Sequence, residues 1–267
     1  MANPSTKAVI MARGLGTRMR ADAAGIALTE EQTQIADQGI KALIPLSNGK
    51  TLLELILDNL RAAGWNEFCL VIGPEHGAIR EFCAVSNHDV VFAVQEHPLG
   101  TADAVLAASG FIGPDDPFLV VNSDNLYPVE SLTRLRAAEC PAMLAFERGS
   151  LVEASNIPAE RIAKFATVEM DGSGYLRRIT EKPAVVGLDT FVSMNAWLFS
   201  PAIFNACRAI GPSERGEYEI ASAVQYGIDH LGMKFAAVKS AEGVLDLSSR
   251  SDIESAERFL KVTFLQS

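Results

Sequence analysis

Short apolar runs and stretches with helical periodicity alternate along the first half of the chain. The apolar runs predict strands at residues 7–12, 68–73, 90–94, 117–124 and 142–147. Apolar residues that recur every three or four positions predict helices at residues 51–65, 75–85, 100–110 and 129–139. Strands that alternate with helices of this length imply right-handed βαβ units and a parallel sheet covered by helices on both faces.

Two of these segments carry additional signals. Residues 51–65 begin at Thr51, a favourable N-cap residue, and Gly64 lies near their end, as expected of a helix. The run FLVVN at residues 118–122 is apolar without alternation, which is typical of a strand buried on both faces.

The second half of the chain is less regular. Residues 161–183 predict two strands joined by a turn at Asp171–Gly174. The remaining pattern predicts strands at 191–200, 234–239 and 243–247, and helices at 201–210, 218–231 and from about Ser251 onward. No linker, repeat or low-complexity tract interrupts the chain, so we expect one domain with an α/β first half and a mixed second half.

Residues 20–39, RADAAGIALTEEQTQIADQG, separate the first strand and its glycine turn from the next apolar stretch. They are small and polar with weak periodicity, which favours a surface helix or a mobile loop. A lid over the glycine turn is the functional alternative, since long insertions beside a site often act in this way.

Composition and charge narrow the classes of partner. The chain has 267 residues, of which 48% are hydrophobic and 21% charged, with a formal net charge of −10. This acidity argues against nucleic acid, which requires a basic surface, but a few local Arg and Lys can still hold a small anion. No apolar run approaches the ~18 residues of a membrane span, and the N-terminus lacks a signal-peptide pattern, so we expect no membrane partner and a cytoplasmic location.

Neither the cysteines nor the histidines suggest a metal centre or a catalytic triad. The cysteines are scattered without zinc spacing, so we expect reduced, mostly buried thiols at positions 69, 83, 140 and 207. The histidines fit no metal or triad spacing and are interpreted as structural or surface residues at positions 76, 88, 97 and 230.

The first strand ends in the glycine-rich sequence VIMARGLGTRM, residues 9–19. Glycines permit a tight turn, and exposed N–H groups with Arg suit an anion, so the turn suggests a phosphate site. A P-loop would need glycine at Ile44, and the dinucleotide fingerprint would need glycine at Met19, so neither motif matches. Arg13 either contacts a phosphate or points outward.

Further motifs follow in order along the chain. IKALIPL contains Lys41, QEHPLGTADAV contains Gln95, Gly100 and Thr101, and VVNSDNLY contains Asn122 and Asp124. ITEKP supplies Glu181 and Lys182, and SMNAWLFSP supplies Asn195. GEYEIASAV and GVLDLSSRSDIESA complete the series, and the second of them contains Asp246.

In this order the segments resemble the sugar-phosphate nucleotidyltransferases, which make UDP-, dTDP-, GDP- or CDP-sugars. The resemblance implies an α/β fold with a Rossmann-like mixed, mainly parallel sheet flanked by helices, and a smaller mixed half that binds the sugar. It implies one nucleotidyltransferase domain, residues 1–267, with a nucleotide-binding half at about 1–148 and an acceptor-binding half with the C-terminal helix at 149–267. Family members are often dimers or tetramers, which makes a homo-oligomer a candidate assembly.

The family reaction is attack by a sugar 1-phosphate oxygen on the α-phosphorus of an NTP, with release of pyrophosphate. Because two anions must meet, charge neutralisation and alignment should dominate catalysis. The resemblance assigns the triphosphate to the turn at Ala12, Gly14, Gly16, Thr17 and Arg18. It assigns the α-phosphate to Lys41, the acceptor phosphate to Lys182, and the base and nucleotide to Gln95, Gly100 and Thr101. The Gln95 amide can both donate and accept, which suits a base edge.

The metal and the acceptor involve residues from both halves. If Asp124 and Asp246 converge on one edge of the sheet, their oxygens form a Mg²⁺ site that bridges the phosphates of the two substrates. The resemblance makes Asn122, Glu181 and Asn195 candidates for the sugar hydroxyls.

The chain departs from the family pattern at several places. Ile40 replaces a proline, Asn195 stands at a glycine position, and the gap from Arg18 to Lys41 is long. Ser123 replaces a glycine before Asp124, which favours an unusual acceptor. The alternatives are a cytidylyltransferase for a non-sugar phosphate or phosphonate, and a non-catalytic nucleotide-binding relative. A GT-A glycosyltransferase would show a D-x-D motif, whereas NSDN has a single aspartate.

Overall fold

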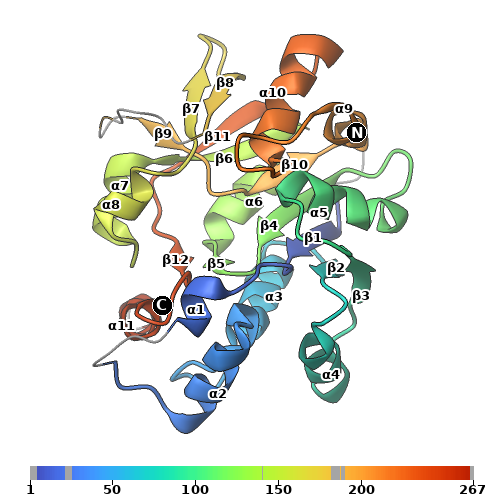
Figure 1. The fold of residues 1–267 in the computed structure, drawn as a ribbon. Helices are drawn as coiled ribbons and strands as arrows, with labels where there is room; N and C mark the ends of the chain where they lie inside the picture. The colour runs from blue at the N-terminus through green and yellow to red at the C-terminus, as the bar shows by residue number, and fades with distance from the viewer. Residues whose placement is uncertain (1–4, 22–25, 140, 182–186, 188–189, 265–267) are drawn as a thin grey trace.

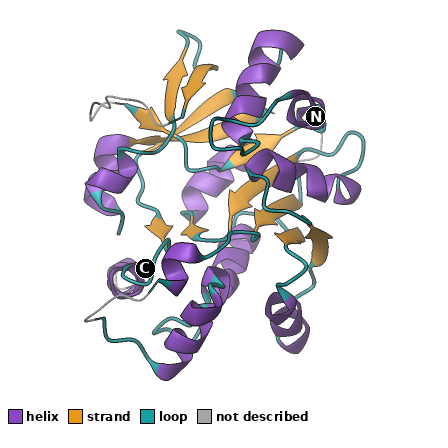
Figure 2. Cartoon of the chain, viewed as in Figure 1, coloured by secondary structure: helices purple, strands orange, loops and turns teal. Residues whose placement is uncertain are grey.

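The structure is a computed structural model that describes residues 5–21, 26–139, 141–181, 187 and 190–264. Within these residues a ten-stranded mixed sheet runs through the centre of the molecule (Figures 1 and 2). Its strands are β1 (Lys7–Met11), β2 (Glu67–Ile72), β3 (Val91–Val94), β4 (Phe118–Asn122), β6 (Ala142–Glu147), β7 (Thr167–Met170), β8 (Leu176–Thr180), β9 (Phe191–Val192), β10 (Trp197–Phe199) and β11 (Ala236–Ser240).

The sheet is parallel in its first half and mainly antiparallel in its second. Its order is β3-β2-β1-β4-β10-β6-β9-β7-β8, and β11 pairs with β6. Strands β3, β2, β1 and β4 are parallel neighbours, while β10 is antiparallel to both β4 and β6. The mixed α/β fold class is therefore confirmed, and the carboxyl ends of four parallel strands meet at one edge.

Helices cover both faces of the sheet. Alternate residues along a strand point to opposite faces, so each face has its own apolar core. Ala8 and Ile10 of β1 face one core, and Val9 and Met11 face the other. The first core includes residues of α1 (Thr17–Arg20), α2 (Glu30–Gln38), α3 (Leu52–Ala62), α4 (Gly77–Val85), α6 (Val129–Ala137), α7 (Arg148–Ala154), α8 (Ala159–Ile162) and α11 (Asp252–Phe264). The second includes residues of α5 (Thr101–Ala107), α9 (Ile203–Ala209) and α10 (Ile220–Leu231). Short 3-10 helices lie at η1 (Lys41–Leu43) and η2 (Ala108–Phe111).

The local signals in the sequence correspond to observed structure. Thr51 caps α3 through a reciprocal capping box with Glu54, and Gly64 follows the helix in a left-handed conformation with φ 91°. The buried run at 118–122 forms β4, whose residues Phe118–Val121 are inaccessible on both faces. The predicted turn joins β7 and β8, where the Asp171 carboxylate accepts hydrogen bonds from two backbone N–H groups of the loop.

The prediction of one strand at residues 191–200 is wrong, because the segment forms two short strands, β9 and β10. Asn195 lies between them in the left-handed region with φ 60°, a conformation that interrupts a strand and that Gly and Asn tolerate best. This accounts for Asn at a position where the family pattern has glycine. Strand β10 is then fixed between β4 and β6 by buried Trp197 and Phe199, whose rings stack with centroids 5.5 Å apart.

The sequence pattern missed two helices between the halves. Helix α7 follows β6 directly and α8 follows Pro158, so the strand expected from residue 161 begins only at Thr167. Leu151 and Ile162 are their fully buried residues, too few to produce a visible helical period in the sequence.

Residues 20–39 contain the surface helix α2, which packs on the rest of the molecule. Its capping residue Gln32 donates hydrogen bonds from Nε2 to the Pro45 carbonyl at 2.9 Å and to Glu257 of α11 at 2.9 Å. The surface-helix interpretation is therefore confirmed for the described part of this segment, while residues 22–25 lie outside it.

The described residues agree with the expectation of buried, reduced cysteines and with the expectation of no membrane span. Cys69, Cys83 and Cys207 are buried free thiols, and burial raises the pKa of each, to about 11, 11 and 12 respectively. Cys140 lies outside the described residues. In the described part of the chain, no helix combines the length and apolarity needed to cross a membrane.

We predict that Asn195→Val lowers the free energy of unfolding by about 2 kcal/mol, because a β-branched residue is strained at φ 60°. Asn195→Gly, the matched control, should remain within about 1 kcal/mol of the wild type. Urea unfolding of the two variants measures the difference. Equal midpoints for the two variants would contradict the conformational explanation.

Candidate active site

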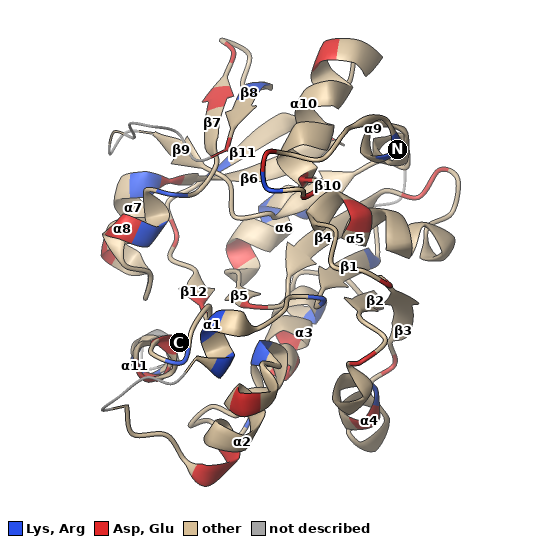
Figure 3. Cartoon of the chain, in the orientation of Figure 1, with Lys and Arg blue, Asp and Glu red and all other residues tan. Residues whose placement is uncertain are grey.

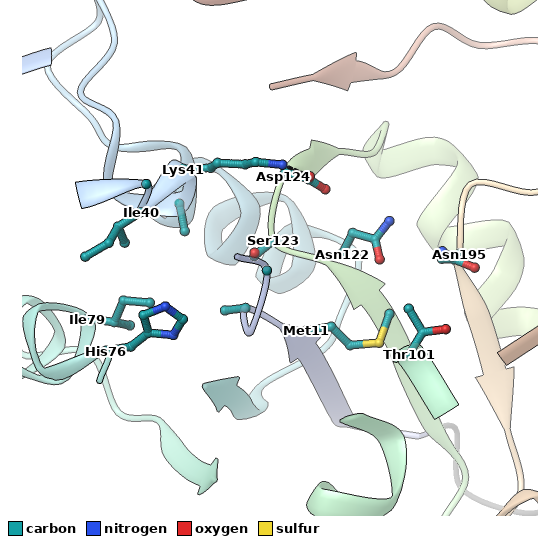
Figure 4. A pocket seen from close by; sticks show the side chains of 14 residues that line it. Met11, Ile40, Lys41, His76, Ile79, Thr101, Asn122, Ser123, Asp124 and Asn195 are labelled. Carbon is teal, nitrogen blue, oxygen red and sulfur yellow. Dashed lines mark hydrogen bonds and ion pairs between the residues drawn. The ribbon is translucent and has the colours of Figure 1, made fainter. Parts of the chain in front are cut away.

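A pocket of about 240 Å³ lies at the carboxyl ends of the parallel strands (Figure 4). Residues predicted for the site that line it are Ala12, Gly14, Lys41, Thr101, Asn122, Asp124 and Asn195. They come from both halves of the sequence. The topology therefore brings together separate positions that sequence motifs alone had selected.

The glycine turn is closed against the end of α2. Gly16 has φ 62°, and a Cβ atom there would lie 2.1 Å from the Gly39 carbonyl oxygen, so only glycine fits. Thr17 and Arg18 follow on the exposed face of α1, beside the pocket residue Gly14. Arg18 has no ion pair or hydrogen bond with the described residues, which leaves its guanidinium available for an anion.

An ion pair between Lys41 and Asp124 lies along one wall of the pocket (Figure 4). Lys41 Nζ lies 2.8 Å from Asp124 Oδ2, and the two side chains are 15% and 24% exposed. Partial burial strengthens this contact relative to a surface pair. The two side chains therefore offer one positive and one negative group at the same wall of the pocket.

Asp246 lies next to Asp124, although it comes from the far end of the chain. Strand β12 (Leu245–Asp246) pairs with β5 (Asn125–Leu126), and Asp246 is the register partner of Asn125. The Leu247 N–H donates to the Asp124 carbonyl at 2.8 Å. The two carboxylates thus converge through this small separate sheet, rather than at the edge of the main sheet as the sequence had suggested.

Asp246 is buried and its carboxylate already has partners. Arg161 donates from a terminal nitrogen to Oδ1 at 2.6 Å, and Asn125 donates to Oδ2 at 2.9 Å. Burial, together with the neighbouring Asp124 charge, raises the pKa of Asp246 above its ordinary value. Asn156 fixes the backbone by accepting from the Asp246 N–H and donating to its carbonyl, at 2.7 and 2.8 Å.

Arg161 and Asn156 are residues that sequence reasoning missed. Both belong to the α7–α8 segment, whose weak pattern predicted no helix. Arg161 also donates to both oxygens of Asp252 at 3.0 and 2.8 Å, so its guanidinium bridges two acidic residues. Figure 3 shows basic residues both on the α7–α8 segment and on α1.

The paired carboxylates fit a magnesium ion that takes most of its ligands from substrate. Among the described residues, no group of three or more His, Cys, Asp or Glu could enclose a metal by itself. Mg²⁺ is usually held by one or two carboxylates together with phosphate oxygens and water. Asp124 and Asp246 would supply the two carboxylates of such a set, and substrate phosphates and water would supply the other ligands.

Gln95 and Gly100, which the sequence predicted for the base, do not line this pocket: Gln95 is 4% exposed and Gly100 is half-buried. Gly100 has φ 121°, and a Cβ there would lie 2.5 Å from the Tyr218 carbonyl oxygen, so the glycine is required by the crossing backbone. Gln95 uses its side-chain N–H groups within the protein, donating to Gly100 O and to Asp103. It therefore does not offer both a donor and an acceptor, as the sequence alone had suggested.

The contacts of Arg13 and His76 narrow their sequence interpretations. Arg13 does not point outward: it is 8% exposed, donates from Nε to the Gln95 carbonyl at 3.0 Å and pairs with Glu75 at 2.6 Å. His76 has a structural contact, as one of its two sequence interpretations expected, and it also lines the pocket beside Ile79 (Figure 4). Its Nδ1 accepts the Gly73 N–H at 3.1 Å, and burial lowers its pKa despite the opposing charge of Glu75, which favours the neutral ring.

The acceptor candidates occupy two separate places. Asn122 and Asn195 line the pocket near Asp124, and the Asn122 amide donates to Asn125 at 3.0 Å. Glu181 instead borders shallow pockets beside Gln225 and Arg215, apart from the pocket of Asp124. Arg215, also missed from the sequence, binds Glu219 at 2.6 Å. Lys182 lies outside the described residues.

Residues 7–262 match the model of the protein family described as nucleotidyl transferase. The chain belongs to the nucleotidyl transferase family. This confirms the family expected from the ordered motifs, and the match extends over both halves of the sequence.

Individual proteins similar to this chain include nucleotidylyltransferases. A glucose-1-phosphate thymidylyltransferase of Streptomyces griseus is 34% identical over 231 residues, which cover 84% of this chain and 57% of that protein. A UTP–glucose-1-phosphate uridylyltransferase, AglF, of Haloferax volcanii is 26% identical over 265 residues, covering 96% of each. The crystal structure of a UDP-glucose pyrophosphorylase complexed with UDP-glucose matches the fold with TM-score 0.69 at 15% identity, covering 98% of this chain and 100% of the other. The chain thus spans little more than half of the Streptomyces relative's length.

In this nucleotidyl transferase the segment after Asp246 also contacts α1, the helix that follows the glycine turn. Arg250 is 7% exposed, and its Nε donates to the Met19 carbonyl of α1 at 3.1 Å. A terminal nitrogen binds Asp37 of α2 at 2.6 Å. The Arg250 side chain therefore connects the C-terminal segment to the helix that carries Arg18 and to α2.

We predict that Arg250→Met lowers the free energy of unfolding by about 2 kcal/mol, because the Met19 carbonyl loses its donor and Asp37 its partner. It should also speed tryptic cleavage after Arg18 and Arg20 of α1, whose Met19 carbonyl loses its contact. Arg258→Met is the control, because Arg258 and Glu254 are exposed and 3.3 Å apart, and the change should cost under about 0.5 kcal/mol. Urea unfolding and timed trypsin digestion test this, and equal losses in both variants would refute it.

Proposed function

We propose that the chain is a sugar-1-phosphate nucleotidylyltransferase that joins an NTP to a sugar 1-phosphate, giving an NDP-sugar and pyrophosphate. The observation that carries the proposal is the juxtaposition of Asp124, Asp246 and Lys41 beside the Gly14–Arg18 turn. Opposite charges at this spacing suit a reaction in which two phosphate groups must approach each other. Family membership and the names of the relatives support the same activity.

The chemistry needs no general base, because the nucleophile is an ionised phosphate oxygen of the acceptor. That oxygen forms a bond to the α-phosphorus, and the bond between the α-phosphorus and the bridging oxygen of pyrophosphate breaks. Lys41 would bind the α-phosphate, and Arg18 with the turn N–H groups would hold the β- and γ-phosphates as negative charge develops there. The neutral His76 ring adds no charge to this wall.

Magnesium is part of the proposal. Asp124 and Asp246 would hold the ion, which supplies charge neutralisation to the bound phosphates. Arg161 would keep the buried Asp246 carboxylate ionised and oriented, since it donates to Oδ1 at 2.6 Å. Asn125 would fix the other oxygen of the same carboxylate through its contact at 2.9 Å.

The acceptor is proposed to bind on the side of the pocket formed by Asn122, Ser123 and Asn195. These side chains offer amide and hydroxyl groups that can pair with sugar hydroxyls. Lys182 would contact the acceptor phosphate from the second half, at about residues 149–267, while residues 1–148 would bind the nucleotide.

Pyrophosphate release in the presence of Mg²⁺ tests the function directly. UTP, dTTP, CTP, GTP and ATP are each tried with a panel of sugar 1-phosphates and with non-sugar phosphates. Release that requires one NTP together with one sugar 1-phosphate is the expected result. Release only with a non-sugar phosphate would show that the acceptor belongs to another class. The absence of both pyrophosphate release and NTP binding would refute the proposal.

We predict that Asp124→Asn lowers kcat by at least about 100-fold, because it removes the charge that would hold Mg²⁺. The Mg²⁺-dependent rise in thermal stability with bound NTP should disappear as well, which is a readout independent of turnover. Asp58→Asn is the control, since Asp58 lies on α3 and pairs with the exposed Lys50. Turnover of Asp124→Asn close to that of Asp58→Asn would rule out the metal role.

A further inference from the structure

We propose that Asp103 is a positioning residue that holds the Gln95 amide with its NH₂ group inward, so that only the Gln95 carbonyl oxygen can meet the nucleobase. This arrangement favours a base with a ring N–H donor, uracil or thymine, over cytosine. The inference rests on the proposed function and deepens it by naming the nucleotide class.

Two acceptors surround the Gln95 NH₂ group. Nε2 donates to Asp103 Oδ2 at 2.7 Å and to the Gly100 carbonyl at 3.0 Å. Both neighbours lack a hydrogen to give, since one is a carboxylate and the other a carbonyl. Turning the amide over would place its oxygen against both of them, so the chemistry of the neighbours fixes the orientation.

The remaining polar groups of Gln95 are also occupied, except for one. Its N–H donates to the Ile72 carbonyl at 2.9 Å, and its backbone carbonyl accepts from Arg13 Nε at 3.0 Å. Arg13 is itself held by Glu75 at 2.6 Å. The side-chain oxygen Oε1 accepts no hydrogen bond from the described residues, so the one group that Gln95 can offer to a ligand is an acceptor.

The position of Gln95 suits a nucleobase. It directly follows β3, and β3, β2, β1 and β4 lie in this order with their carboxyl ends at one edge. His76 after β2, Gly14 after β1 and Asp124 after β4 line the pocket along that edge. A nucleotide whose phosphates lie at Gly14 and Asp124 would extend its base toward β2 and β3, where Gln95 is.

An acceptor at this place separates the pyrimidines. Uracil and thymine carry a hydrogen on N3 that can donate to Oε1, whereas N3 of cytosine is a lone-pair acceptor. Two acceptors facing each other repel and leave both without a partner, which is the form of discrimination that separates ligands best. A freely rotating glutamine would lose this selectivity, because it could present its NH₂ group to cytosine instead.

The test compares the wild type with Asp103→Asn and Asp103→Ala. The amide introduced by Asp103→Asn could donate to Oε1, and Asp103→Ala removes the stronger of the two acceptors, so both variants should let the Gln95 amide turn over. We expect the ratio of kcat/KM with the better of UTP and dTTP to kcat/KM with CTP to fall at least about fivefold. Asp115→Asn, an exposed residue beyond α5, is the matched control and should leave the ratio unchanged.

Nucleotide binding gives a second readout that does not depend on turnover. Calorimetric Kd values for UTP, dTTP and CTP should show the same fall in preference in both variants. A wild type that prefers CTP, or variants that keep their melting temperature and the wild-type ratio, would overturn the role of Asp103. Absence of pyrophosphate release with intact nucleotide preference would instead count against the proposed function alone.

Discussion

Two carboxylates held side by side by a short backbone pairing set the conditions for the rest of the site. Asp124 ends the segment after β4, and β12 brings Asp246 next to it through the register with Asn125 and the Leu247–Asp124 hydrogen bond. Adjacent negative charges with little solvent repel each other, and this is costly unless cations offset it. Lys41 forms an ion pair with Asp124, and Arg161 forms one with Asp246, each with a nitrogen–oxygen distance of at most 2.8 Å. Under the proposed function, this pocket would bind ligands that bring further negative charge and a divalent cation.

The same C-terminal segment joins the metal side of the pocket to the phosphate side. Asp252 accepts from Arg161 and from the backbone N–H groups of Ser248 and Ser249, while Arg250 reaches the carbonyl of Met19. Residues from 245 to 252 are thus fixed at both ends by buried charged groups. Because α1 carries Arg18, any loosening of this segment would move a cation relative to Asp124. The stability of the fold and the alignment of the charges therefore depend on the same contacts.

The parallel half of the sheet gives the site its direction. Four strands end at one edge, so a base, a triphosphate and an acceptor can lie along it in the order β3, β2, β1 and β4. The antiparallel strand β10 then continues the edge and adds Asn195, whose left-handed conformation turns the chain at the pocket. One continuous sheet therefore aligns groups that lie far apart in the sequence.

The sequence by itself determined the βαβ order, the glycine turn, and the pocket positions of Lys41, Asn122 and Asp124, because these depend on local periodicity and on short motifs at strand ends. It did not identify Arg161, Asn156 or His76, since their importance comes from neighbours distant in sequence and their own segments carry little pattern. Asp103 lies only 8 positions after Gln95, yet its role was equally hidden, because the helix that carries it must first fold back beside the strand. Only the tertiary structure decided which donors and acceptors are already used and which stay available, since hydrogen-bond partners are a property of distances in space rather than of residue type.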